Sequence, residues 1–285
     1  MGLLDGKVMI VTGAGGGIGR EHALAMSKEG AAIVVNDLGG SRDGSGSGGT
    51  MADGVVEEIR AAGGEAVANY DDVSSVEGGL SILQSGLDAF EKVDGVVNNA
   101  GILRDKSFAN TTEEMWDIVV KVHLKGTYCV THAVYNHLKQ RNAGGVIINT
   151  SSTSGLDGNF GQGNYGAAKA GIAGLSRCLA IEGKKYGIRV FILAPVAHTR
   201  LTEDLPGFEK LATAMNPALV SPLVVYLASD LAADHSGKTF FVGGGRIAEM
   251  KVVTAKGITK VEDGGVWTPE EIAGRMSAGE ILLPE

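Results

Sequence analysis

The chain has 285 residues, of which 44% are hydrophobic and 20% charged, and its formal net charge is −8. This length and composition are typical of a globular protein with a sizeable core. The negative charge argues against a nucleic-acid partner, because binding to phosphate backbones requires a basic surface. No apolar run is long enough to span a bilayer, and the first residues lack the pattern of a secretory signal, so we expect a cytoplasmic protein with no membrane partner.

Short apolar runs alternate with amphipathic stretches along most of the chain. The runs are rich in Val and Ile, which is typical of buried parallel strands: KVMIVTG, AAIVVND, EAVANY, DGVVNNA, GVIINTS, IRVFILAP and KTFFVGG. The helical stretches between them are Ile18–Lys28, Met51–Ala62, Val76–Phe90, Glu113–Gln140 and Tyr165–Tyr186. This order predicts an α/β fold: a single Rossmann-type doubly wound domain over residues 1–245, with a seven-stranded parallel sheet and helices on both faces.

Two segments depart from this alternation. Leu38–Thr50 is a Gly/Ser-rich loop after the second strand, and it fits either a mobile flap near a cofactor or a plain surface insertion. After Gly245 no further strand–helix cycle follows, so we expect residues 246–285 to form a C-terminal extension packed on the same domain. Within this extension, Thr268 is predicted to cap a helix whose first residue is Pro269.

A glycine-rich turn, TGAGGGIG at Thr12–Gly19, follows the first strand and opens the first helix. Gly13 permits a tight turn, whereas Gly17 and Gly19 allow a pyrophosphate to approach backbone N–H groups at the positive end of the helix. The second strand ends at Asp37. A carboxylate there accepts both ribose hydroxyls of NAD and repels the 2′-phosphate of NADP. The sequence therefore predicts NAD as the cofactor.

The stretch GNYGAAKAG places Tyr165 and Lys169 one helical turn apart on the same helix face. A free tyrosine titrates near pH 10, and we expect the lysine cation to lower the pKa of this phenol. Such a phenol exchanges a proton with an alcohol or a ketone. Ser152, just after the strand GVIINTS, could hydrogen-bond the substrate oxygen. No histidine or cysteine spacing indicates a metal site, so none is expected.

These motifs resemble, in order and spacing, those of the short-chain dehydrogenase/reductase family over residues 5–245: TGAGGGIG, NNAG at 98–101, Ser152 and YGAAK. The resemblance implies that Tyr165 is the acid/base, that Lys169 lowers its pKa and binds the nicotinamide ribose, and that Ser152 orients the carbonyl or alcohol. The cofactor contacts that it implies are Gly13, Gly17, Ile18, Gly19, Asp37, Leu38, Asp72, Val73, Asn99, Gly101, Tyr165, Lys169, Ala197 and Thr199.

His123 departs from the general family pattern. In VKVHLKGTY it stands where most members carry an asparagine that links the lysine to a water-borne proton relay. Because histidine titrates near neutrality, we include it among the catalytic candidates. A buried, purely structural histidine is an equally good interpretation.

Several longer stretches narrow the resemblance: VVNDLGG, NNAGILRDKSF, VHLKGTY and GNFGQGNYGAAK. They are similar to the (3R)-hydroxyacyl-CoA dehydrogenase part of peroxisomal multifunctional β-oxidation enzymes, and bacterial relatives include hydroxysteroid dehydrogenases. The resemblance implies NAD-linked oxidation of an apolar substrate, a 3-hydroxyacyl-CoA or a hydroxysteroid, in a homodimer or homotetramer. Residues 199–217 are expected to form a lid over the substrate, although their Leu, Met and Phe also fit an ordinary helix core.

Two other functions remain as alternatives. A 3-oxoacyl reductase would use NADPH, which Asp37 and Gly16 disfavour, although Arg20 and Arg42 are close enough in sequence to bind a 2′-phosphate. A non-catalytic nucleotide-binding scaffold is disfavoured because the chain keeps Ser152 and the Tyr–Lys pair.

Overall fold

The computed structural model describes residues 2–40, 43, 46, 48–198, 214–260 and 265–283. Contacts within the chain define two units, Met1–Met250 and Lys251–Glu285. The first unit contains the sheet and the candidate site. The second contains helix α9 (Pro269–Ser277). Nothing in this division tests the expected packing of residues 246–285 on the domain, which stays a prediction.

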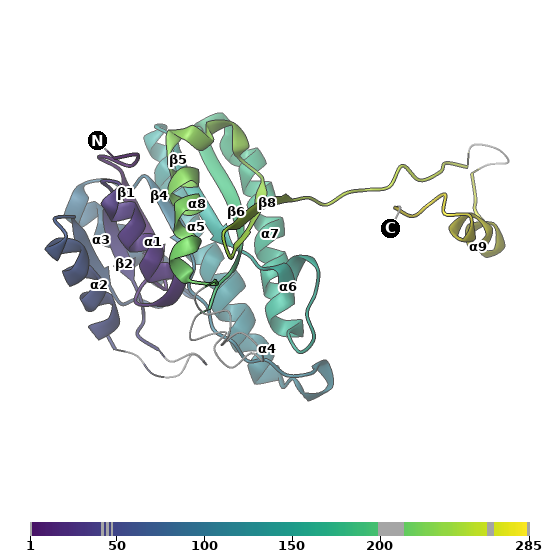
Figure 1. Ribbon diagram of the computed structural model, residues 1–285, viewed down its shortest axis with the longest axis horizontal. Helices are drawn as coiled ribbons and strands as arrows, with labels where there is room; N and C mark the ends of the chain where they lie inside the picture. Colours follow the sequence, from purple (N-terminus) through teal and green to yellow (C-terminus); the bar gives the residue numbers. More distant parts are fainter. Residues whose placement is uncertain are drawn as a thin grey trace. The chain divides into compact units, whose positions relative to one another are not determined.

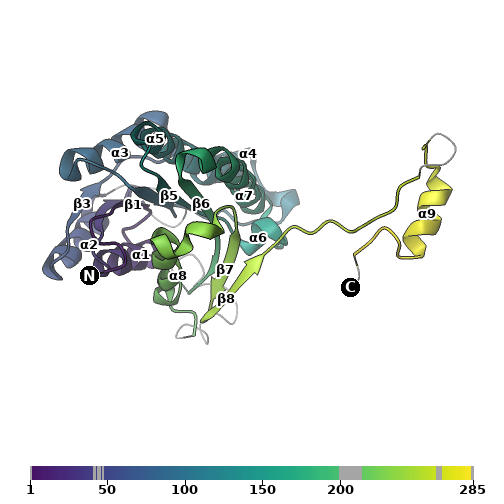
Figure 2. The same ribbon diagram turned by 90° about the horizontal axis from the view of Figure 1, so that it is seen from above.

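All seven predicted strands are present, and they pair in parallel. Figure 1 and Figure 2 together label them. They are β1 (Val8–Thr12), β2 (Ala32–Asn36), β3 (Ala66–Asn69), β4 (Gly95–Asn98), β5 (Gly145–Thr150), β6 (Ile188–Val196) and β7 (Thr239–Gly243). Their spatial order is β3-β2-β1-β4-β5-β6-β7, so the direction of winding reverses between β1 and β4. Such a reversal leaves a crevice at the carboxyl ends of the strands, where doubly wound sheets bind ligands.

An eighth strand, β8 (Arg246–Met250), pairs antiparallel with β7 and corrects the expected strand count. The turn before it consists of Gly244 and Gly245, whose φ angles are +54° and +78°. Two consecutive residues with positive φ match the twist of a tight β-hairpin, and glycine adopts this conformation without steric cost. The sequence prediction ended the regular alternation at this glycine pair and therefore missed the hairpin.

Helices cover both faces of the sheet (Figure 2). One face carries α1 (Gly17–Lys28), α2 (Thr50–Ala61) and α8 (Ser221–Ala228). The other carries α3 (Val76–Phe90), α4 (Glu113–Val120), α5 (Gly126–Arg141) and α7 (Gly163–Gly183). Shorter turns are α6 (Thr153–Leu156) and the 3₁₀ segments η1 (Phe108–Asn110), η3 (Lys184–Tyr186), η5 (Pro217–Leu219) and η6 (Asp230–His235).

Two buried apolar clusters join the helices to the sheet, one on each face. Neighbouring strand residues alternate between them: Val11 of β1 packs in the cluster with Met26 of α1, whereas Ile10 packs with Ile82 of α3. Every residue of β1 and β2 is buried, which explains why these strands are continuous Val/Ile runs rather than alternating patterns. The fold class and the two-sided cover of helices are thus as predicted.

The long helix predicted over Glu113–Gln140 is interrupted. A π-helical segment, η2 (Lys121–Lys125), separates α4 from α5 and contains the buried His123. Single-turn π segments insert an extra residue into a helix and occur frequently at functional sites. Apolar periodicity alone gave no signal for this interruption.

In the second unit, α9 begins where the sequence predicts. The Thr268 hydroxyl accepts a hydrogen bond from the Glu271 amide (3.2 Å), and the Glu271 carboxylate accepts one from the Thr268 amide (2.9 Å). This is a capping box, with Pro269 at the start of the helix. Among the helices within the described ranges, none is both long and apolar enough to cross a membrane.

Candidate active site

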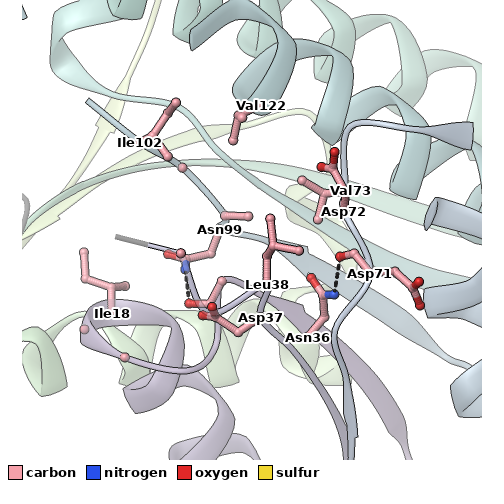
Figure 3. Close-up of a pocket in the computed structure, with 16 residues that line it drawn as sticks. Ile18, Asn36, Asp37, Leu38, Asp71, Asp72, Val73, Asn99, Ile102 and Val122 are labelled. Carbon is pink, nitrogen blue, oxygen red and sulfur yellow. Dashed lines mark hydrogen bonds between the residues drawn. The ribbon is translucent and has the colours of Figure 1, made fainter. Parts of the chain in front are cut away.

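A pocket opens at the carboxyl ends of β1, β2 and β4, beside the point where the strand order reverses (Figure 3). It has an open volume of about 940 Å³. Its lining residues are Gly13, Gly16, Gly17, Ile18, Asn36, Asp37, Leu38, Gly40, Asp71, Asp72, Val73, Asn99, Ala100, Gly101, Ile102 and Val122.

The glycine turn at the base of the pocket is packed without room for side chains. Gly13 has a φ of +63°, and an added Cβ would lie 2.7 Å from the Ala100 Cα. A Cβ on Gly19 would lie 2.1 Å from the Gly13 carbonyl oxygen. Gly16 precedes α1, and no side chain caps the first turn of the helix. The N–H groups of that turn are therefore available to a pyrophosphate, and this cradle fits a dinucleotide.

The Asp37 carboxylate is fixed at the end of β2. Its Oδ2 accepts a hydrogen bond from the Gly15 amide (2.8 Å) and its Oδ1 one from the Gly39 amide (2.7 Å). The residue is only 7% exposed, yet it lines the pocket (Figure 3). A carboxylate oriented in this way by two amides is preorganised to accept hydroxyl groups from a ribose.

Asn99 connects the glycine turn to the end of β4. Its Nδ2 donates to the carbonyl oxygens of Thr12 (3.1 Å) and Gly13 (3.2 Å). The side chain thus holds the turn against the end of β4, the neighbour of β1 in the sheet (Figure 3). At the end of β2, the side-chain amide of Asn36 donates a hydrogen bond to the backbone carbonyl of Asp71 (3.0 Å). Asp72 and Val73 follow Asp71 in the chain, and all of these residues line the pocket.

The catalytic candidates come from the end of β5 and from α7. Ser152, which is 8% exposed, caps α6, and its Oγ accepts a hydrogen bond from the Ser154 amide (3.1 Å). On α7, the Lys169 Nζ lies 5.5 Å from the ring centroid of Tyr165 and donates to the Thr150 carbonyl (2.6 Å). The chain therefore brings the serine, the phenol and the amine together, as the spacing predicted.

The protonation of this pair differs from the expectation. Burial raises the pKa of Tyr165 to about 12; the hydrogen bond with Ser152 acts in the opposite direction, and the Asp105 charge raises it further. Burial also lowers the pKa of Lys169 to about 7. The expected lowering of the phenol's pKa by the lysine is therefore wrong for the protein alone. Burial is the first cause in both cases, because removing water destabilises the charged form of each group.

His123 is 3% exposed and lies between the pocket and the catalytic pair. Its Nε2 is 2.8 Å from the carbonyl oxygen of Ile102 and 3.1 Å from the amide nitrogen of the same residue. Its ring meets the Tyr165 ring edge-on, with 5.1 Å between centroids. Burial, followed by the Lys169 charge, lowers the pKa of His123 to about 3, so the ring is neutral. Among the described residues, its Nδ1 has no hydrogen-bond partner.

The remaining predicted residues are placed as follows. Nine of the predicted cofactor residues line the pocket: Gly13, Gly17, Ile18, Asp37, Leu38, Asp72, Val73, Asn99 and Gly101. Gly19 lies beneath the glycine turn, and Ala197 is buried in the apolar cluster on the α1 face. Thr199 lies outside the described residues, as does most of the expected lid, residues 199–213. Their roles in binding stay predictions.

The sequence reasoning did not include seven lining residues: Gly16, Asn36, Gly40, Asp71, Ala100, Ile102 and Val122. Gly16 and Ala100 lie inside the motifs TGAGGGIG and NNAG, and Asn36, Asp71 and Ile102 are chain neighbours of predicted contacts, so the motifs themselves held the signal for most of them. Val122 is different, because it reaches the pocket from the π-helical segment. In the parts of the chain that the structure describes, no group of three or more His, Cys, Asp or Glu could hold a metal ion.

Comparisons with known proteins agree with this geometry. Residues 7–206 match the family described as short chain dehydrogenase. The chain is 48% identical to mouse peroxisomal multifunctional enzyme type 2, with 94% of this chain and 36% of that protein covered. It thus spans about a third of that relative's length. It is 37% identical to the hydroxyacyl-CoA dehydrogenase ChsB1 of Mycobacterium tuberculosis, with 96% and 88% covered.

A solved structure supports the same assignment. The crystal structure of a short chain dehydrogenase from Mycobacterium avium is similar with a TM-score of 0.86 and 43% sequence identity, covering 100% of this chain and 98% of that one. The resemblance inferred from the motifs is thereby confirmed, including the similarity to the multifunctional enzymes. The chain belongs to the short-chain dehydrogenase/reductase family and is an oxidoreductase that acts on alcohols with a nicotinamide cofactor.

Proposed function

We propose that this protein oxidises the hydroxyl group of a 3-hydroxyacyl-CoA or a hydroxysteroid to a ketone, with NAD as the cofactor. The similarity to a hydroxyacyl-CoA dehydrogenase along nearly the whole chain supports the substrate class. The observation that carries the cofactor preference is the Asp37 carboxylate, held by two backbone amides where the ribose hydroxyls of NAD would lie.

A second observation supports NAD over NADP. Arg20 is the nearby cation within the described residues that could bind a 2′-phosphate, but its guanidinium pairs with Glu21 and Glu58. Arg42, the other cation considered from the sequence, lies outside the described residues. The surroundings of Asp37 thus support the unphosphorylated ribose of NAD, and the NADPH-dependent 3-oxoacyl reductase stays the disfavoured alternative.

The residues of the cluster divide the chemistry between them. When bound, NAD supplies the hydride acceptor. In the proposed oxidation, Tyr165 would accept the proton of the substrate hydroxyl as its phenolate, after releasing its own proton to solvent. In the reverse direction the protonated phenol, which burial favours by raising its pKa to about 12, would donate its proton to the ketone oxygen. The Ser152 hydroxyl donates a hydrogen bond to the same substrate oxygen and stabilises the negative charge that develops on it. Lys169, held by the Thr150 carbonyl, contributes its charge next to the phenol when it is protonated.

The test is a panel of 3-hydroxyacyl-CoAs of both configurations and of hydroxysteroids, each incubated with NAD or NADP. We expect reduction of NAD with at least one member of the panel and a preference for NAD of more than about tenfold, equivalent to about 1.4 kcal/mol. Tyr165→Phe serves as the control for non-enzymatic turnover. A preference for NADPH with 3-oxoacyl substrates would instead establish the biosynthetic reductase. No turnover with any member would contradict the proposal.

We also infer that the chain assembles into a homodimer or homotetramer. The support is exposed apolar surface on the long helices: Tyr128 on α5 is 45% exposed and Ile181 on α7 is 80% exposed. Light scattering at micromolar concentration should give two or four times the chain mass of 29.3 kDa. The mass of a single chain would refute this assembly.

A further inference from the structure

Two loops that are far apart in sequence meet beside Tyr165. The loop after β4 contributes Lys106, and the loop before α7 contributes Gln162; the two residues form an isolated parallel β-bridge. The Lys106 amide donates to the Gly161 carbonyl (2.9 Å). The start of the crossover from β4 to β5 is therefore attached to the start of α7, the helix that carries Tyr165 and Lys169.

The Gln162 side chain occupies the centre of this junction. Its Nε2 donates to the Asp105 carboxylate (2.7 Å). Its Oε1 accepts from the Ser154 hydroxyl (2.7 Å) and from the Asn159 amide (3.1 Å). A carboxylate only accepts hydrogen bonds, so Asp105 fixes which end of the Gln162 amide faces it. The other end, the acceptor, is thereby directed at Ser154.

Ser154 transmits this constraint to Ser152. Its hydroxyl is held by Gln162, and its backbone amide donates to the Ser152 Oγ (3.1 Å). The amide of Gly155 donates to the Ser152 carbonyl (3.0 Å), which completes the tight turn. The Ser152 oxygen accepts this hydrogen bond, and its single proton remains for one further partner, either the Tyr165 oxygen or a substrate oxygen.

We propose that Gln162 is a positioning residue of the active site, which orients the Ser152 hydroxyl through Ser154 and is itself held by Asp105. It touches no reacting atom. A hydrogen-bond donor that is displaced stabilises the transition state much less, so the position of the Ser152 hydroxyl, and through it Gln162, affects the reaction rate. This inference holds for any alcohol substrate, so it does not depend on the acyl-CoA or steroid identity proposed above.

The first test needs no substrate. Hydrogen–deuterium exchange of the segment 152–156 is compared between the wild type and Gln162→Leu, a substitution that keeps the side-chain size but removes both hydrogen-bonding groups. We expect faster exchange in this segment with Gln162→Leu. Asn159→Ala is the matched control, because Asn159 bonds to the same Gln162 oxygen but does not touch Ser154. Unchanged exchange in Gln162→Leu would overturn the proposal.

The second test is a double-mutant cycle on turnover, with a substrate identified in the panel. Gln162→Leu should lower kcat about tenfold in the wild type and less than twofold in Ser152→Ala, because its effect passes through the serine. Equal losses in both backgrounds would show a general structural role and refute the proposal. If Gln162→Leu fails to fold, Ser154→Ala takes its place, because it removes the hydroxyl that bonds to Gln162 and keeps the backbone amide that bonds to Ser152. It should give the same large loss in the wild type and small loss in Ser152→Ala. NADH affinity should remain unchanged throughout.

Discussion

The dinucleotide pocket and the catalytic cluster are built in opposite ways. The glycine turn has no side-chain volume to lose, and an added Cβ at Gly13 or Gly19 meets backbone atoms at 2.7 or 2.1 Å. The catalytic cluster consists of buried polar side chains, of which Ser152, Lys169 and His123 are all less than 9% exposed. Substitutions that add atoms should therefore destabilise the glycine turn, whereas substitutions that remove polar groups should lower the turnover that depends on the catalytic cluster.

The largest effect is expected at the phenol of the catalytic cluster. Tyr165→Phe removes the hydroxyl that we propose exchanges the proton but keeps the ring that packs on His123. Proton transfer of this kind contributes about 10²- to 10⁴-fold, so kcat should fall by about 10³-fold. Steady-state kinetics measures this loss, and a fluorescence titration should show unchanged NADH affinity. A variant with wild-type turnover would remove Tyr165 from the mechanism.

The glycine turn should respond to a single added methyl group. Gly19→Ala places a Cβ against the Gly13 carbonyl, and such overpacking costs about 1–3 kcal/mol of unfolding free energy. Gly174 of α7 is the matched control, because an added Cβ there meets nothing within 4 Å. Its replacement by Ala should stabilise the helix by about 0.5–1 kcal/mol. Urea denaturation measures the unfolding free energy of both variants. Equal changes in Gly19→Ala and Gly174→Ala would refute the expected difference between the two positions.

Asp37 should determine cofactor choice. Asp37→Ser removes the carboxylate that the Gly15 and Gly39 amides hold, and with it both the ribose acceptor and the charge that repels a 2′-phosphate. The ratio of NADPH to NADH dissociation constants should fall at least about tenfold, equivalent to about 1.4 kcal/mol. Calorimetric titration measures it. As a control, Asp88→Asn on α3 removes one negative charge away from the pocket. A similar fall in the ratio of dissociation constants in that variant would show that net charge, and not the position of Asp37, determines the preference.

A further prediction concerns the pH dependence of stability. Burial lowers the pKa of Lys169 from 10.5 to about 7, so between these values the unfolded chain binds more protons than the folded one. The contribution of Lys169 to the unfolding free energy therefore rises with pH from about 7 to about 10. Lys169→Met should remove this rise. Urea denaturation at several pH values, wild type against variant, measures the difference; parallel curves would show that Lys169 is not buried as a neutral amine.

The sequence predicted those parts of the molecule that local pattern determines. Seven strands could be recognised because parallel strands buried on both faces are continuous Val/Ile runs. Thr268 could be recognised as a cap because Pro269 follows it directly at the first position of the helix. The pairing of Tyr165 with Lys169 follows from helical spacing alone. In each case the determining residues are close together in the chain.

What the sequence did not predict depends on distant contacts. The π-helical segment that buries His123 leaves no mark in the apolar periodicity of Glu113–Gln140. The direction of the Tyr165 pKa shift depends on how much water the whole fold excludes, which spacing does not reveal. The hydrogen bonds of Gln162 join residues 57 positions apart in the case of Asp105, so no short motif contains them.

The hairpin that adds β8 also changes how the sheet ends. Without it, the buried strand β7 would present its unpaired backbone to other molecules, and exposed strand edges are templates for aggregation. Instead the last strand is five residues long and carries the charged side chains of Arg246 and Glu249. At the opposite margin, β3 has only four residues. Short or charged border strands resist the intermolecular pairing that leads to fibres.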